Sequence, residues 1–314
     1  MKYCVIDTDT AGDDVTSIII GSLLELNIVG ITTVAGNVPV ALATKNALLT
    51  LEKVNRSDIP VFQGADKPLL RDLVTAQYVH GDDGMGNSNF EDPVKRPEQM
   101  NAAIKLVDFA REYSGNIIIC AQAPLTNIAL ATMIDRHFSE NVEHLYIMGG
   151  TFRHSGNITP AAEYNFYVDP EAADIVLHAG FNITILPWDV CLSQATIGIN
   201  EINEQYRKNK NALFKFYLDV NRSAIEYNKS GRSGILIDGL THSDSVLMSL
   251  ILDSTIIEEI KNVNIDISKL DELTRGFSSM CIDSASNIKV ITKVNSDKFK
   301  EILFNTLAKG TKFI

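Results

Sequence analysis

The chain has 314 residues, of which 45% are hydrophobic and 21% charged, a balance typical of a globular protein with a sizeable buried core. The net charge of −11 argues against a nucleic acid as partner, because an acidic protein repels the phosphate backbone. No uninterrupted apolar run reaches membrane-spanning length and no signal sequence precedes the first expected strand, so we expect a cytoplasmic enzyme or binding protein without a membrane partner.

Short apolar strands alternate with helices over the first 190 residues. Strands are expected at residues 3–6, 28–34, 59–62, 116–120, 144–148 and 182–186. Helices are expected at residues 15–24, 40–54, 101–113, 127–133 and 170–179. This alternation predicts an α/β fold, with a mostly parallel central sheet and helices on both faces, as in Rossmann-like open sheets.

The pattern changes after residue 200. Residues 202–228 have a polar helical pattern, residues 246–252 an apolar one, and late strands are expected at 263–267 and 288–294. Residues 67–97 are rich in Gly, Asp and Pro, which predicts a long loop that acts as a lid. Because no repeat or linker divides the chain, residues 1–314 are expected to form a single domain.

The four cysteines are far apart and lack the spacing of a metal-binding motif. Three of them, Cys4, Cys120 and Cys281, lie in apolar runs. We therefore expect buried, reduced thiols without a catalytic role.

Four carboxylates follow the first expected strand within eight positions: Asp7, Asp9, Asp13 and Asp14. One such aspartate could simply cap the next helix, but four would repel one another unless a cation compensates their charge. Carboxylate oxygens are the ligands that Ca²⁺ and Mg²⁺ prefer. An EF-hand is disfavoured, because the fifth position of such a loop would be Ala11 and the twelfth Ile18.

Other polar side chains follow the later expected strands, and the carboxyl ends of parallel strands meet at one edge of a sheet. Those expected to join the aspartates are Asn37, Gln122, Asn157, Glu163 and Asn165, together with Asp244, which lies just before the apolar helical pattern at residues 246–252. The set is rich in carboxylates and amides and poor in basic groups. It suits a metal ion with a neutral polyhydroxylated ligand, such as a sugar, better than it suits a phosphate.

Several motifs together resemble those of the inosine–uridine nucleoside hydrolase family, nearly from end to end. They are DTDTAGDD at residues 7–14, VAGN at 34–37, HGDDGMG at 80–86, APLTN at 123–127, MGG at 148–150, GNITPAAEYN at 156–165 and TRG at 274–276. The resemblance implies hydrolysis of the N-glycosidic bond of purine or pyrimidine ribonucleosides to free base and ribose, a salvage reaction, by a homodimer or homotetramer.

The resemblance also implies a Ca²⁺ ion and roles for individual residues. The implied ligands are Asp9, Asp14, the backbone carbonyl of Gln122, and Asp244, with Asp9 taking the proton of a calcium-bound water. The implied ribose-binding residues are Asp13, Asn37, Met148, Asn157, Glu163 and Asn165. His80 and Tyr227 are candidates for contacts to the base or for a lid.

Two departures from the family motifs affect the expected site. Thr10 and Ala11 stand where the family has Pro and Gly, and a glycine follows one place later. Ser243 precedes Asp244 where the best-known branch has a histidine that protonates the leaving base, and His242 lies one residue further back. Serine is a poor general acid, because its pKa is far from neutral.

Three interpretations of the leaving-group step stay open. His242 could swing into the site through a local bulge. Protonation could come from His80, Tyr227 or a water chain, or the base could depart with little help. The catalytic candidates from the sequence are therefore Asp9, His242 and Ser243.

Two other classes of protein remain as alternatives. One is a nucleoside- or ribose-binding protein of the same fold that is catalytically weak or inactive. The distant one is a haloacid-dehalogenase-like phosphatase, whose DxD motif would be Asp7 and Asp9. That class needs Thr or Val where this chain has Ala11.

Overall fold

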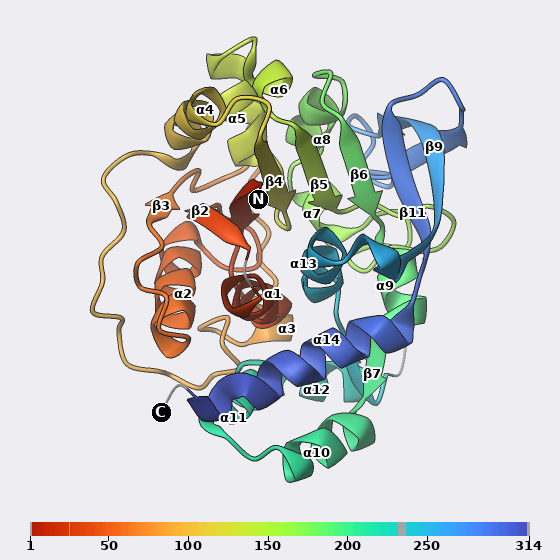
Figure 1. Cartoon of the computed structure of the whole chain (residues 1–314). Coiled ribbons are helices and arrows are strands. Elements are labelled where there is room, and N and C mark those ends of the chain that lie inside the picture. The colour runs from red at the N-terminus through yellow and green to blue at the C-terminus, as the bar shows by residue number, and fades with distance from the viewer. Residues whose placement is uncertain (1, 25, 232–236, 313–314) are drawn as a thin grey trace.

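The structure, a computed structural model, describes residues 2–24, 26–231 and 237–312. Within these residues one sheet has nine strands (Figure 1). In spatial order they are β10 (Ser278–Ile282), β9 (Ile257–Ile267), β11 (Ile288–Val294), β6 (Ile183–Leu186), β5 (His144–Met148), β4 (Ile117–Ala121), β1 (Tyr3–Thr8), β2 (Asn27–Thr33) and β3 (Val61–Gln63). Neighbouring strands are parallel from β11 to β3, and β9 pairs antiparallel with both β10 and β11. The predicted, mostly parallel sheet is confirmed.

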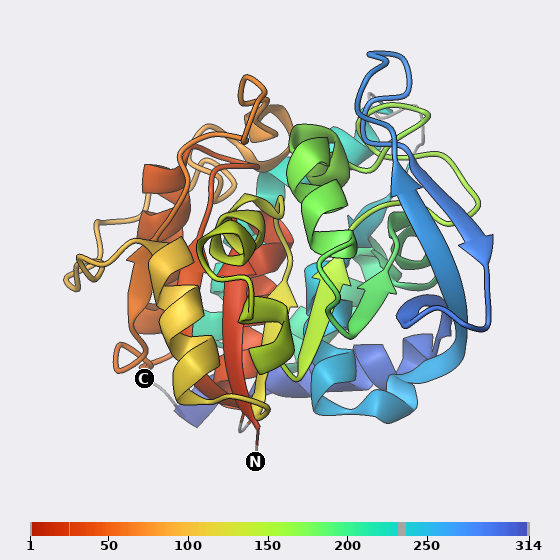
Figure 2. The same cartoon turned by 90° about the horizontal axis from the view of Figure 1, so that it is seen from above.

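Helices cover both faces of this sheet (Figures 1 and 2). One face carries α1 (Gly12–Leu23), α2 (Val40–Lys53), α13 (Asp244–Leu252) and α14 (Ser296–Ala308). The other carries α4 (Ala102–Glu112), α5 (Thr126–Ile134) and α8 (Pro170–Leu177). The side chains of β4 show why both faces need cover: Ile118 and Cys120 belong to the first core, and Ile117 and Ile119 to the second.

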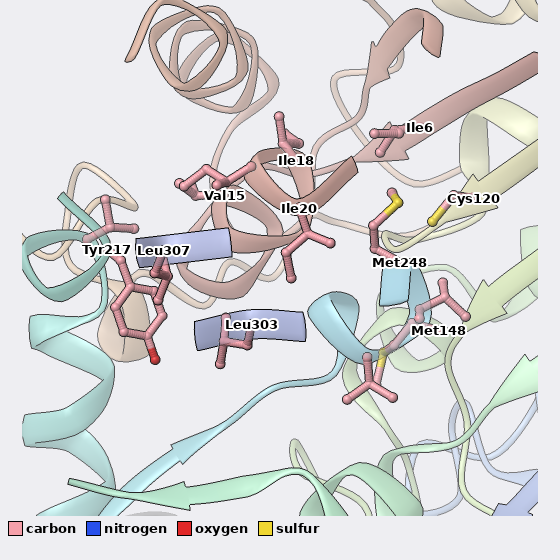
Figure 3. Packing of buried hydrophobic residues seen from close by; sticks show 14 of the residues in the cluster. Ile6, Val15, Ile18, Ile20, Cys120, Met148, Tyr217, Met248, Leu303 and Leu307 are labelled. Carbon is pink, nitrogen blue, oxygen red and sulfur yellow. The ribbon is translucent and has the colours of Figure 1, made fainter. Parts of the chain in front are cut away.

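The first core brings together helices that are far apart in the sequence. In Figure 3, Val15, Ile18 and Ile20 of α1 lie near Met248 of α13 and Leu303 and Leu307 of α14. This packing fixes the start of α13 next to the start of α1. Two segments separated by more than 200 residues can therefore contribute to one site.

Side-chain caps define the starts of several helices. The side chain of Asn101 accepts a hydrogen bond from the amide of Ala103 at the start of α4, at 2.9 Å. Asp169 caps α8 in the same way and is followed by Pro170, which suits the first helical position. Asn211 caps α11 (Ala212–Val220) through the amide of Phe214. This cap divides the stretch that the sequence shows as one helical pattern.

The second half of the chain differs most from the prediction. Residues 202–228 fall in three helices, α10 (Ile199–Lys208), α11 and α12 (Arg222–Lys229). The strand β10 and the long helix α14 were not predicted, and β9 is longer than expected. The prediction for Cys281 was wrong, because this residue lies exposed on the edge strand β10, whereas Cys4, Cys120 and Cys191 are buried and free.

Shorter elements complete the description. They are α3 (Gln77–His80), α6 (Phe138–Asn141), α7 (Tyr164–Val168), α9 (Trp188–Gln194), β7 (Thr196–Gly198), β8 (Gly239–Thr241) and 3-10 turns at Ser254–Ile256 and Lys309–Lys312. Between β3 and α4, only α3 interrupts the predicted long loop among the described residues. In the described ranges, no helix is long and apolar enough to cross a membrane.

The strand order reverses between β1 and β4. From β1 the chain runs outward to β2 and β3, then returns to β4 on the other side and continues to β5 and β6. In open α/β sheets, ligands bind in the crevice at the carboxyl ends of the strands at such a point. The acidic motif follows β1 directly, so the fold places it at this crevice.

Candidate active site

A pocket lies where the strand order reverses, and most of the residues singled out from the sequence line it. Of the fourteen candidates, these twelve do so: Asp13, Asp14, Asn37, His80, Gln122, Met148, Asn157, Glu163, Asn165, Tyr227, Ser243 and Asp244. The other two, Asp9 and His242, are buried outside the lining. The fold therefore assembles residues from both ends of the chain into one cavity.

Three aspartates lie in or next to this pocket, and Asp14 and Asp244 line it directly. Asp9, Asp14 and Asp244 are all buried. Burial raises the pKa of Asp14 to about 6, although hydrogen bonds from Thr8 and Gln122 oppose the shift. Burial, and then the charge of Asp14, raise the pKa of both Asp9 and Asp244 well above the usual range. Burial and mutual repulsion therefore both oppose ionising all three carboxylates at once.

Asp9 is held against the loop that follows β2. Its Oδ2 accepts a hydrogen bond from the backbone amide of Asn37 at 2.6 Å. A Cβ at Gly36 would lie 2.1 Å from the same oxygen, so only glycine allows this close approach. The side chain of Asn37 in turn donates to Asp14 Oδ2 at 3.4 Å. The VAGN motif thus positions Asp9.

The chemistry of these donors fits a hard cation. Asp9 Oδ1 is sealed from solvent and has no hydrogen-bond partner among the described residues, which is costly for a carboxylate oxygen unless something positive binds it. Among the described residues, none of the ion pairs involves Asp9, Asp14 or Asp244. The same part of the chain holds no group of three His, Cys, Asp or Glu side chains already arranged around a metal position. The residue types therefore fit a metal ion, but the side chains of the described residues are not arranged as a complete coordination shell.

Glu163 and Asn165 organise the opposite wall. Glu163 caps α7, and its two oxygens accept hydrogen bonds from the amides of Gly150 (2.8 Å), Asn165 (2.8 Å) and Phe166 (3.2 Å). Burial raises the pKa of Glu163 to about 7 against these bonds. The Asn165 amide group donates to the Met148 carbonyl at 3.1 Å, which leaves its Oδ1 as an acceptor.

Asn157 belongs to the same wall. Its Oδ1 accepts a hydrogen bond from the backbone amide of Tyr164 at 2.8 Å, so its NH₂ group remains as a donor. The Tyr164 hydroxyl donates to the carbonyl of Val74 at 2.6 Å. This bond ties the wall to the long loop between β3 and α4.

Asp13 connects the starts of α1 and α13. Its Oδ2 accepts hydrogen bonds from the amides of Asp244 (2.8 Å) and Ser245 (3.0 Å), and its Oδ1 accepts one from the Ser245 hydroxyl. Asp13 therefore caps α13 from another helix and fixes the position of Asp244. A ribose hydroxyl would have to share a carboxylate that is already bonded.

His242 and Ser243 point to different places. The His242 ring is buried between Tyr217 and Phe299. Its Nε2 bonds with the Tyr217 hydroxyl at 2.8 Å and its Nδ1 faces the carbonyl of Ala195 at 3.4 Å. Reaching the pocket would break these contacts, and in this structure His242 is a core residue outside the pocket lining. Ser243 lines the pocket, and its hydroxyl makes no cap on α13.

Aromatic residues also line the pocket. The rings of Tyr78 on α3 and Tyr227 on α12 meet edge to face, with centroids 5.6 Å apart. His80 ends α3, and burial lowers the pKa of its ring to about 4. Trp188 also lines the pocket, and its buried indole nitrogen has no hydrogen-bond partner among the residues that the structure describes.

Sequence reasoning missed one wall of the pocket. Asn221, Ala224, Tyr227 and Asn228 line it, and only Tyr227 was singled out. Three of these four residues belong to α12, with Asn221 at its N-cap. Spacings of three and four residues place such positions on one face of a helix, so the polar helical pattern carried a usable signal.

Comparisons with known proteins agree with this geometry. The family model described as inosine-uridine preferring nucleoside hydrolase matches residues 4–301. An uncharacterized protein of Schizosaccharomyces pombe is 35% identical over 314 residues, covering 97% of this chain and 98% of that protein. The pyrimidine-specific ribonucleoside hydrolase RihA of a Shewanella species is 32% identical over 309 residues, covering 97% and 95%. The solved plant nucleoside hydrolase PpNRh1 superimposes with a TM-score of 0.91 at 29% identity, covering 98% and 99%.

Proposed function

The chain belongs to the inosine-uridine preferring nucleoside hydrolase family, and we propose that pyrimidine ribonucleosides, above all uridine, are its substrates. Family membership makes it a hydrolase of the N-glycosidic bond of nucleosides. The observation that carries the assignment of the site is the convergence of twelve candidate residues on one pocket. The choice of pyrimidines follows the RihA relative, which matches along nearly its whole length. The phosphatase alternative has no support from the family match.

We propose that Ca²⁺ is the metal of this metal-dependent family that binds here. Asp9, Asp14 and Asp244 would hold it, together with the backbone carbonyl of Gln122, an oxygen that accepts no hydrogen bond among the described residues. When bound, the cation would hold ribose hydroxyls and make a water molecule more acidic.

Asp9 is the general base in this proposal. Its Oδ2 is fixed by the amide of Asn37, and its Oδ1 has no hydrogen-bond partner in the part of the chain that the structure describes. Oδ1 takes the proton of the water that attacks the anomeric carbon. The sugar becomes positively charged in the transition state, and the carboxylates around it stabilise that charge.

The remaining hydrogen-bonding capacity of the walls suits a ribose. A carboxylate has about four acceptor positions, and three backbone amides use three of those of Glu163, which leaves one for a 5′-hydroxyl. Asn157 keeps its donor and Asn165 keeps its acceptor. A hydroxyl group both donates and accepts, so it can bond with both kinds of residue.

The leaving base has no histidine at position 243 to protonate it. A serine hydroxyl is too weak an acid to replace one. We therefore propose that this enzyme activates its leaving group by hydrogen bonding rather than by full proton transfer. Substrates with an activated leaving group, such as p-nitrophenyl riboside, should be cleaved well.

The variant Asp9→Ala tests the proposal. It should lower ribose release from uridine by at least about 10²-fold, the usual contribution of a general base, and weaken Ca²⁺ binding. The matched control is Asp266→Ala, because Asp266 is 87% exposed on β9 and far from the pocket in sequence. Full activity of Asp9→Ala would refute the assignment. Tight uridine binding by the wild type without release would indicate a nucleoside-binding protein instead.

The location and assembly of the protein remain predictions from the sequence. We propose a cytoplasmic homodimer or homotetramer that acts in nucleoside salvage. Chromatography with light scattering measures the assembly directly.

A further inference from the structure

Gly12 directly follows Thr10 and Ala11, the two departures from the family motif, and the reaction itself gives no reason for a glycine at this position. It opens α1 with a φ of +38°, a conformation that glycine adopts easily. Its amide donates to the carbonyl of Gly84 at 3.2 Å. The acidic motif is therefore tied to the glycine-rich loop that carries His80.

The His80 ring occupies the space that a side chain at position 12 would need. A Cβ at Gly12 would lie 2.4 Å from His80 Nδ1 and 2.8 Å from Cε1. Non-bonded carbon and nitrogen atoms do not approach so closely. Any other residue at position 12 would push the ring out of its place.

The two ring nitrogens of His80 have different surroundings. Nδ1 is sealed from solvent and has no hydrogen-bond partner within residues 2–24, 26–231 and 237–312. The ring lines the pocket, Nε2 is not sealed, and it makes no hydrogen bond to the described residues. A buried N–H without an acceptor is rarer than a buried acceptor without a donor, so the neutral ring should carry its proton on Nε2. The lowered pKa of His80 agrees with a neutral ring.

We propose that Gly12 is a positioning residue that seats His80 with its Nε2–H directed at the departing base. This inference rests on the proposed function. When the bond between C1′ and the base breaks, its electron pair moves onto the base and its carbonyl oxygens. A neutral N–H donor stabilises that charge without giving up its proton. The attacking water forms the new bond to C1′ and loses its proton to Asp9, and solvent later protonates the base.

This arrangement explains how a chain with Ser243 could still release uracil. A preorganised donor aimed at developing negative charge contributes about 10²–10³-fold to turnover in other enzymes. It would also favour bases that present a carbonyl oxygen to Nε2–H. The glycine at position 12 and the serine at position 243 then belong to one mechanism.

A double-mutant cycle separates this role from a purely structural one. The variants are Gly12→Ala, His80→Ala and the double variant, measured on uridine and on p-nitrophenyl riboside, with calcium affinity as a second readout. Gly115→Ala is the control for backbone strain, because Gly115 has a φ of +71° and no atom within 4 Å of an added Cβ.

Acting through His80, Gly12→Ala should lower kcat/KM for uridine by about 10²-fold, as misplaced catalytic groups do. In the His80→Ala background, Gly12→Ala should lower kcat/KM for uridine little further. It should leave the cleavage of p-nitrophenyl riboside and the calcium affinity unchanged. Additive losses, equal losses on both substrates, or a double variant that fails to fold where His80→Ala folds would overturn the inference. A wild type that releases no ribose from uridine would instead refute the proposed function.

Discussion

Glu163 offers a quantitative test of how burial and hydrogen bonding compete in this site. The side chain is 1% exposed, and three backbone amides donate to its carboxylate. These bonds favour the charged form, whereas burial favours the neutral one. Burial prevails, because the pKa rises from its ordinary value of 4.5 to about 7. Glu163→Gln removes the titration while keeping the size of the side chain.

The shift predicts both the sign and the size of a pH effect. Between pH 4.5 and about 7 the folded protein holds a proton on Glu163 that the unfolded chain has lost. The stability that this proton contributes is fully present below pH 4.5 and disappears as the pH rises through 7. A pKa shift from 4.5 to about 7 corresponds to about 3 kcal/mol in the free energy of unfolding.

Urea unfolding of the wild type and of Glu163→Gln at pH 5, 6, 7 and 8, with a chelator present, measures the effect. The wild type should lose about 2.5 kcal/mol relative to the variant between pH 5 and pH 8, most of it before pH 7.5. A difference that stays constant with pH would show that the three amide bonds keep the pKa near its ordinary value. The reasoning from burial would then be wrong.

Two further predictions concern the region around α13. Ser243→His should raise turnover of nucleosides with poor leaving groups, measured as kcat for inosine, because it restores an acid beside the pocket; an unchanged kcat would place leaving-group activation elsewhere. Asp13→Ala should lower the free energy of unfolding by about 1–2 kcal/mol, because α13 loses its cap, and urea unfolding measures this loss. Unchanged stability would mean that solvent satisfies the freed amides.

Much of the site could be predicted because its residues follow strands in a regular way. The apolar strands and the alternation with helices defined a parallel sheet, and such a sheet brings the residues after its strands to one edge. Asp14, Asn37 and Gln122 are examples, since each follows a parallel strand and each lines the pocket. The metal and ribose roles of these residues remain predictions.

The orientation of single side chains could not be predicted in the same way. His242 is next to two pocket residues in sequence, yet its ring turns into the core, where Tyr217 and Phe299 pack against it. That choice depends on α11 and α14, which contribute those two rings. The sequence pattern also gave no sign that His80 would lie against Gly12, because this contact depends on the path of a long loop.

A panel of uridine, cytidine, inosine and adenosine, assayed for ribose release with and without a chelator, tests the account most directly. We expect release from uridine and cytidine, its loss on chelation, and its recovery when Ca²⁺ is added in excess. Release that survives complete removal of metal would contradict the role assigned to Asp9, Asp14 and Asp244. No release from any of the four nucleosides would contradict the proposed activity itself.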